Sequence, residues 1–216
     1  MTPQADAGSS VRLPRPCLML VTDRHMAGGE DGLIDAVGGA IDGGVNVVQF
    51  REKDLSGDAL SALASRIRGV TQGRALLIVN GSAGVAIESG ADGVHLPEDA
   101  PMMEERAGLI VGRSVHSVGA AERAAGEDVD YVIAGPIYET RSHPGAAPAG
   151  VDLIRKISEV VSVPVIAIGG IDYQRVTDAM RAGASGVAVI SAIFCSSDPQ
   201  KAAAQLRNVL EEGAPS

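Results

Sequence analysis

The hexapeptide Ala182-Gly183-Ala184-Ser185-Gly186-Val187 has close counterparts at Ser89–Val94 and Asp42–Val47. In each copy a glycine stands where a helix would end, two linking residues follow, and an apolar stretch then begins. Glycine suits that place because the residue after a helix often takes a left-handed conformation. A repeated helix-to-strand junction is expected of a chain built from similar strand–helix units.

On both sides of these junctions, short apolar segments recur along the whole chain. Several are rich in Val and Ile, which is typical of strands that are covered on both faces. Most are separated by stretches with helical spacing, so we expect a helix after each strand, eight times. This alternation predicts an α/β protein with a (β/α)8 TIM barrel, and an open doubly wound sheet is the alternative. The expected strands are Cys17–Val21, Asn46–Phe50, Leu76–Asn80, Gly93–Leu96, Leu109–Ser114, Tyr131–Gly135, Val163–Ile168 and Gly186–Ile190.

The domain organisation follows from the same pattern. No linker or change of composition divides the chain, so we expect one barrel domain at 17–212 after an unstructured N-terminal tail at 1–16. The tail lacks the basic and then apolar order of a signal peptide, and no apolar run reaches the roughly 18 residues of a membrane span. Cys17 and Cys195 form no CxxC motif, which suits a reducing compartment and predicts a cytoplasmic protein.

Composition narrows the class of partner. The 216 residues carry a formal net charge of −9, which disfavours nucleic acid and anionic membranes as partners. Aromatic residues make up only 2% and Trp is absent, so a platform for stacking nucleobases is not expected. We therefore expect a small-molecule substrate. Apolar helix faces leave room for a symmetric homodimer, but the sequence does not locate its interface.

Functional groups of a barrel gather where its strands end. Gln49, Arg51 and Lys53 alternate, so they share one face of an extended segment and suit a carboxylate or phosphate. The alternative is a solvated loop whose charge partners are Glu52 and Asp54. Further candidate substrate-binding residues at or after strand ends are Asn80, Ser114, Thr140 and Ser142.

The motifs near the end of the chain predict a phosphate-binding site more specifically than the other motifs do. Gly169 and Gly170 follow one expected strand, and Ile190 and Ser191 end the next and open a short extra helix. Backbone N–H groups at such positions bind phosphate, and the Ser191 hydroxyl adds a donor. The alternative is that the two glycines only make a tight turn.

His116 and His143 are two of the histidines that follow expected strands. His116 follows Leu109–Ser114, and a histidine at a barrel mouth can move a proton near neutral pH. It could equally bond only a backbone carbonyl. His143 lies in a Ser-His-Pro-Gly loop, where it could be a simple surface residue.

Together these motifs resemble the thiamine phosphate synthase/TenI family from about Leu18 to Leu210. The resemblance implies a (β/α)8 barrel and a role in thiamine biosynthesis. The segments that carry it are Val21-Thr22-Asp23, Gln49-Phe50-Arg51-Glu52-Lys53, Ala91-Asp92-Gly93-Val94-His95-Leu96, Gly135-Pro136-Ile137-Tyr138 and Val165-Ile166-Ala167-Ile168-Gly169-Gly170-Ile171.

The family implies two competing activities. The synthase joins a pyrimidine diphosphate to a thiazole phosphate with Mg²⁺, which needs carboxylate ligands. Its pattern has Asn-Asp and a second acidic residue five positions after the histidine of the Asp-Gly-Val-His motif, where this chain has Gly81 and Ala100. Its Thr-x-Thr-Lys loop reads Thr140-Arg141-Ser142-His143 here. Asp99 or Glu98 could still recruit the ion.

The other branch, TenI, is a thiazole tautomerase, which needs neither metal nor cofactor. Gly112–Ser117, His95-Leu96-Pro97, Tyr138-Glu139-Thr140 and Ala192-Ile193-Phe194 resemble that branch. The resemblance implies that His116 acts as base and then acid, although synthases carry a histidine there too.

Our leading hypothesis is therefore a metal-independent tautomerase. Its thiazole substrate would place its phosphate on Gly169, Gly170 and Ser191 and its carboxylate near Arg51 or Lys53. The alternatives are a divergent Mg²⁺-dependent synthase and a non-catalytic regulator that binds thiazole phosphate.

Overall fold

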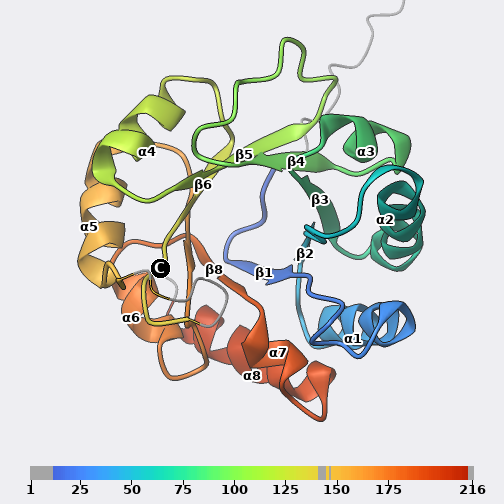
Figure 1. Cartoon of the computed structure of the whole chain (residues 1–216). Coiled ribbons are helices and arrows are strands. Elements are labelled where there is room, and N and C mark those ends of the chain that lie inside the picture. Colours follow the sequence, from blue (N-terminus) through green and yellow to red (C-terminus); the bar gives the residue numbers. More distant parts are fainter. Residues whose placement is uncertain (1–11, 141–144, 146, 214–216) are drawn as a thin grey trace, which may run out of the picture.

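The computed structural model describes residues 12–140, 145 and 147–213. Eight parallel strands close into a barrel in which each strand pairs with the next and β8 pairs with β1 (Figure 1). The predicted TIM barrel is thus confirmed. The strands are β1 (Cys17–Val21), β2 (Val47–Phe50), β3 (Leu76–Asn80), β4 (Gly93–Leu96), β5 (Ile110–Val115), β6 (Tyr131–Ala134), β7 (Val165–Ile168) and β8 (Gly186–Val189).

The apolar composition of the strands follows from burial on both faces. In β1, Cys17, Met19 and Val21 belong to the cluster inside the barrel, whereas Leu18 and Leu20 pack in the layer between strands and helices. Successive side chains of a strand point to opposite faces, so both layers need apolar residues. This is why the strands read as continuous apolar runs rather than as alternating ones.

The helices form a ring around the barrel (Figure 1). One expectation is wrong: residues 97–109, between β4 and β5, contain no helix. Pro97 and Pro101 lack the backbone N–H that a helix interior needs, and Gly108 has a left-handed φ of 76°. The helices are α1 (Glu30–Asp42), α2 (Gly57–Thr71), α3 (Ala83–Glu88), α4 (Val118–Ala125), α5 (Val151–Val160), α6 (Val176–Arg181), the short extra α7 (Ser191–Phe194) and α8 (Pro199–Glu212).

The repeated junctions do contain left-handed glycines. Gly90 and Gly183 have φ values of 65° and 103°, each two residues after a helix ends. In the first copy Gly43 is right-handed and Gly44 takes the left-handed conformation, with φ 107°. At Gly183 a Cβ would also lie 2.8 Å from Ser158 Oγ, so the close packing of α5 adds a second reason for glycine.

The packed chain begins before residue 17, the expected start of the barrel. Leu13 is buried and belongs to the cluster inside the barrel. The carbonyl of Pro16 accepts hydrogen bonds from Asn46 Nδ2 at 3.0 Å and Arg207 Nη1 at 3.2 Å. Of the expected tail, 1–11 lies outside the described residues.

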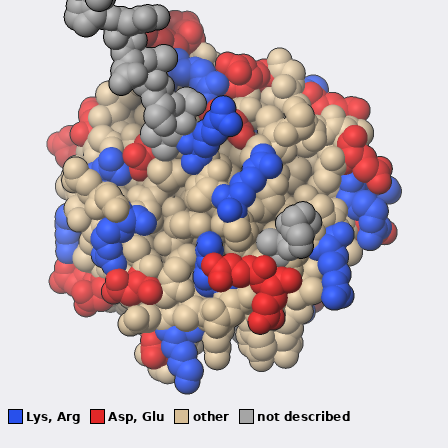
Figure 2. Space-filling model, turned by 180° about the vertical axis from the view of Figure 1, so that it is seen from behind, with Lys and Arg blue, Asp and Glu red and all other residues tan. Residues whose placement is uncertain are grey.

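The surface gives two further findings. On the face in Figure 2, basic and acidic side chains are interspersed, with no large patch of one sign. Among the described helices, none is long and apolar enough to cross a membrane.

Candidate active site

A cavity of about 230 Å³ opens at the carboxyl ends of the strands, and every strand or the loop after it contributes to its lining. The structure brings together all but one of the residues predicted for the site, because the ends of parallel barrel strands meet on one rim. Ser142 lies outside the described residues. The predicted site residues that line the cavity are Gln49, Arg51, Lys53, Asn80, Ser114, His116, Thr140, Gly169, Gly170, Ile190 and Ser191.

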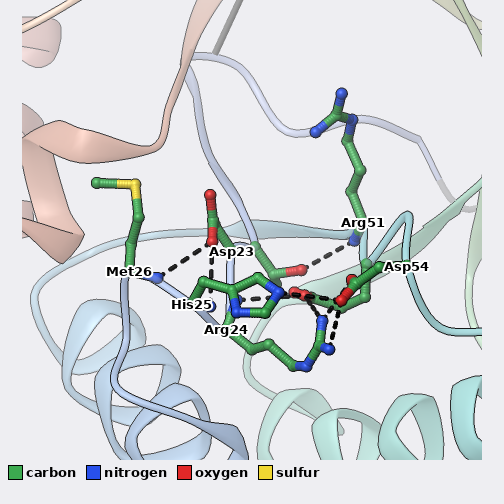
Figure 3. Close-up of polar contacts among 8 residues, drawn as sticks. Asp23, Arg24, His25, Met26, Arg51 and Asp54 are labelled. Carbon is green, nitrogen blue, oxygen red and sulfur yellow. Dashed lines mark hydrogen bonds and ion pairs between the residues drawn. The ribbon is translucent and has the colours of Figure 1, made fainter. Parts of the chain in front are cut away.

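The segment after β2 places two cations against the cavity. Arg51 and Lys53 line it, and Arg51 is held by its backbone N–H, which donates to Thr22 Oγ1 at 2.8 Å. Burial lowers the pKa of Arg51, and the Arg51 charge is the main cause that lowers the pKa of Lys53. The side chains of Glu52 and Asp54 instead contact Arg24 from the loop after β1. Figure 3 shows the contact between Arg24 and Asp54. The part of the rim after β2 therefore presents positive charge to the cavity, although the chain is acidic overall.

The loops after β7 and β8 lie side by side, since these strands are neighbours in the barrel. Gly169 and Gly170 both have left-handed backbones, with φ 100° and 64°. A Cβ on Gly169 would lie 2.7 Å from Pro136 Cα, and one on Gly170 would lie 2.5 Å from the Glu139 carbonyl oxygen. The glycines thus serve the tight packing proposed as the alternative, and their backbone also borders the cavity, as the phosphate hypothesis requires.

His116 forms a pair with Glu98 at the cavity edge. Glu98 Oε2 lies 2.7 Å from His116 Nδ1 and accepts the His116 backbone N–H, also at 2.7 Å. When the carboxylate is ionised, this contact places the ring proton on Nδ1 and leaves the Nε2 lone pair available. The pair can therefore accept a proton at Nε2.

A second histidine lies deeper, inside the barrel. His95 is buried, its ring stacks on Tyr131 at 5.7 Å between centroids, and its Nε2 lies 2.8 Å from Ser114 Oγ. Burial above all, and then the charges of Arg113 and Arg51, lower the pKa of His95 to about 3. The ring is therefore neutral near pH 7 and serves as a hydrogen-bond partner for Ser114.

Three contributors were missed by sequence reasoning: Glu98 as the partner of His116, Arg24 as the partner of Glu52 and Asp54, and Arg113. Buried Arg113 donates from Nη1 to the carbonyls of Pro97, Glu98 and Ala100 at 3.1, 3.0 and 2.6 Å. It thereby fixes the loop that carries Glu98. The pairing of Glu98 with His116 could have been predicted from strand order, because β4 and β5 are neighbours and these residues follow their carboxyl ends.

A magnesium ion takes several oxygen ligands. Among the described residues, no group of three or more His, Cys, Asp or Glu is placed to hold a metal ion. Glu98 is bonded to His116, Asp99 is exposed, and Gly81 and Ala100 offer no side-chain oxygen. These residues do not fit an ion held by protein side chains.

Comparison with known proteins places this site in a family. The sequence model described as thiamine monophosphate synthase matches residues 18–193, which is most of the chain. The chain belongs to the thiamine monophosphate synthase family. The thiamine-phosphate synthase of Methanoculleus marisnigri is 43% identical over 198 residues, covering 88% of this chain and 93% of that protein. The thiamine-phosphate synthase of Chloroflexus aurantiacus is 40% identical over 198 residues, covering 88% of this chain and 90% of that protein.

Solved structures agree with this family. A thiamine phosphate pyrophosphorylase from Pyrococcus furiosus superposes with a TM-score of 0.84 at 32% identity, covering 92% of this chain and 97% of that one. A 3-hexulose-6-phosphate synthase also superposes, with a TM-score of 0.69, but at 18% identity, and this likeness shows the barrel fold alone. Membership of the thiamine monophosphate synthase family was predicted from the motifs and is confirmed. The TenI-type branch is not singled out by these comparisons.

Proposed function

We propose that this chain is an enzyme of thiamine biosynthesis that acts on a phosphorylated thiazole and isomerises it by proton transfer. The family supports the pathway. The observation that carries the reaction is the His116–Glu98 pair beside the cavity. The positions at which the synthase pattern has acids, 81 and 100, hold Gly and Ala here, and a proton shift has no need of such ligands.

In this reaction the substrate phosphate lies against the backbone of Gly169 and Gly170 and the hydroxyl of Ser191. The substrate carboxylate faces Arg51 or Lys53, the two cations that follow β2 on the same rim. Nε2 of His116 removes a proton from the ring carbon, the electron pair moves through the ring, and Nε2 returns a proton to the exocyclic carbon. Atoms and charge balance without oxidant or cofactor. A positioned general acid–base group of this kind contributes about 10²–10⁴-fold.

The test is to supply the product of thiazole synthase and follow the absorbance of the aromatic thiazole. His116→Asn should lose about 10²–10⁴-fold in rate. Arg66→Met is the control, because Arg66 pairs only with Glu30 and Asp31 on the surface and does not line the cavity. An His116→Asn variant as fast as the parent would contradict the mechanism.

The second candidate function is that of the synthase. The names of the relatives support the synthase better than they support the isomerase. The proteins compared above are named thiamine-phosphate synthase or thiamine phosphate pyrophosphorylase. In this proposal the two groups of anion-binding residues, those after β7 and β8 and those after β2, hold the phosphorylated thiazole and the diphosphate of the pyrimidine. Formation of thiamine phosphate from both substrates, dependent on Mg²⁺ and lost in EDTA, would establish it and displace the isomerase. The same assay without product formation rejects it.

We also propose a small phosphorylated substrate, no nucleic-acid or membrane partner, a cytoplasmic location and a homodimer, as expected from the sequence. Light scattering on the purified protein would decide between monomer and dimer.

A further inference from the structure

The segment that follows β2 divides its charges between two sides. Arg51 and Lys53 line the cavity, whereas Glu52 and Asp54, which alternate with them in sequence, contact Arg24 from the loop after β1. Strand β2 ends at Phe50, and residues 53 and 54 form a turn, so the path of the chain directs neighbouring side chains to different sides. The backbone therefore separates two cations from two carboxylates that are their immediate neighbours in the chain.

Arg24 forms ion pairs with both carboxylates. Its Nη1 and Nη2 lie 2.5 and 2.6 Å from the two Asp54 carboxylate oxygens, which is a two-pronged contact that a planar guanidinium makes well. Nη1 also lies 3.3 Å from Glu52 Oε2, and the Arg24 backbone N–H donates to that oxygen at 3.2 Å. His25 Nε2 adds a contact to Asp54 at 3.0 Å.

The carboxylate of Asp23, which precedes Arg24, also has hydrogen-bond partners. Asp23 Oδ1 accepts the backbone N–H groups of His25 and Met26, both at 3.1 Å. In Figure 3 the Arg51 side chain extends away from Arg24 and Asp54. Within the described part of the chain, no carboxylate forms an ion pair with Arg51 or Lys53. The charges of Asp23 and Glu52 still act on Arg51 from a distance, but neither carboxylate occupies the cavity side of the two cations as a direct partner.

This separation of charges requires that the Glu52 carboxylate be buried, which is energetically unfavourable. Glu52 is nearly fully buried, with 2% of its side chain exposed, and its Oε1 has no hydrogen-bond partner. Burying a carboxylate is unfavourable unless it is paired. An arrangement in which Glu52 or Asp54 neutralised Arg51 or Lys53 would be electrostatically favourable, but it would fill the anion site with a protein group.

We propose that Arg24 is a positioning residue that holds Glu52 and Asp54 away from Arg51 and Lys53, so that both cations remain available to an anionic ligand. The inference rests on the proposed function only in requiring that an anion binds at these cations. Inorganic pyrophosphate is the probe, so the result does not depend on whether the chain is an isomerase or a synthase.

The first experiment compares Arg24→Met with Arg66→Met by calorimetric titration with pyrophosphate. Arg66 is a matched control because it also contacts two carboxylates, Glu30 at 2.8 Å and Asp31 at 2.5 Å, but it does not line the cavity. Arg24→Met should weaken binding about tenfold, the size of one charge-assisted contact, and Arg66→Met should leave it within about twofold. Equal affinities in the two variants would overturn the proposal.

The second experiment separates release of the carboxylates from simple loss of structure. Adding Glu52→Gln and Asp54→Asn to Arg24→Met removes the competing charges, so affinity should return to within about threefold of the parent. In an Arg51→Met/Lys53→Met background, Arg24→Met should have no further effect. Failure to recover in the triple variant, or a full additional loss in that background, would overturn the proposal.

Arg24→Met leaves buried Glu52 without its cation, so a variant that keeps the charge is needed if it does not fold. Arg24→Lys retains the charge beside Glu52 but cannot contact both Asp54 oxygens in the same way. It should weaken pyrophosphate binding about threefold, and Asp54→Asn should reverse that loss. A loss that Asp54→Asn leaves unchanged would overturn the proposal on its own.

Discussion

His95 shows how burial sets the chemistry of a single residue. Its pKa is lowered to about 3, whereas an unfolded-chain histidine titrates near 6.5. Below about pH 6.5 the unfolded chain takes up a proton that the folded protein does not, so this residue makes the fold less stable as pH falls toward 3. Above that range it has no such effect. The contribution of His95 to stability is thus greatest near neutral pH.

We expect His95 to lower the free energy of unfolding by up to ~1.4 kcal/mol for each pH unit between about 6 and 3. Urea unfolding of the parent and of His95→Asn at several pH values measures this, because Asn can still bond Ser114 but does not titrate. Carboxylates contribute equally to both proteins, and only the difference between the two curves belongs to His95. Parallel curves would show that the buried ring does become protonated.

At this scale the sequence predicted where residues lie but not what they bond. Arg51, Lys53 and His116 were expected at the barrel mouth, because position along a strand decides which rim a residue reaches. The pairing of His116 with Glu98 depends on the path of residues 97–109, which Arg113 fixes through three carbonyls. The partner of Glu52 depends likewise on side-chain conformations in a different loop, which no spacing rule encodes.

At the scale of elements, helix α4 begins directly beside His116, and its first turn is held by Ser117. The Ser117 Oγ accepts the Ala120 backbone N–H at 3.2 Å, whereas Ser56, in the same position before α2, makes no such bond. A capping serine satisfies one of the free N–H groups at the start of a helix. Ser117 therefore stabilises the element that anchors the end of β5.

We expect Ser117→Ala to lower the free energy of unfolding by about 1 kcal/mol, the usual contribution of a cap. Ser56→Ala, the matched control, should change it much less, since its hydroxyl caps nothing. Chemical denaturation of both variants measures the difference. Two equal losses would mean that the hydroxyl bond contributes nothing and that only helix propensity is affected.

The elements themselves were largely predictable because each strand is apolar on both faces and each junction carries a turn residue. Strand bounds fall within about two residues of expectation. The segment 97–109 is the exception, since its Met and Ala residues resemble a helix face while Pro101 interrupts the pattern. The strand–helix alternation of the sequence therefore predicts one helix too many, at a loop that contributes to the site.

On the scale of the whole molecule, barrel closure is what turns scattered residues into one site. Pairing of β8 with β1 brings Ser191 and Arg51, far apart in sequence, onto one rim. The protein around that rim carries a formal charge of −9, so an anion meets repulsion at long range and attraction at Arg51 and Lys53. Binding is the balance of these two contributions, and salt weakens both.

We expect the two contributions to be separable by ionic strength. In the parent protein, added salt screens the attraction of the two cations, so pyrophosphate affinity should fall as salt rises. In Arg51→Met/Lys53→Met the remaining electrostatic contribution is mainly the repulsion of an acidic protein, so the fall should be smaller or reversed. Calorimetric titrations from low salt to physiological salt, where the screening length is roughly 8 Å, measure both slopes. Identical slopes would mean that these cations do not meet the anion, because only charges at the binding site distinguish the two proteins.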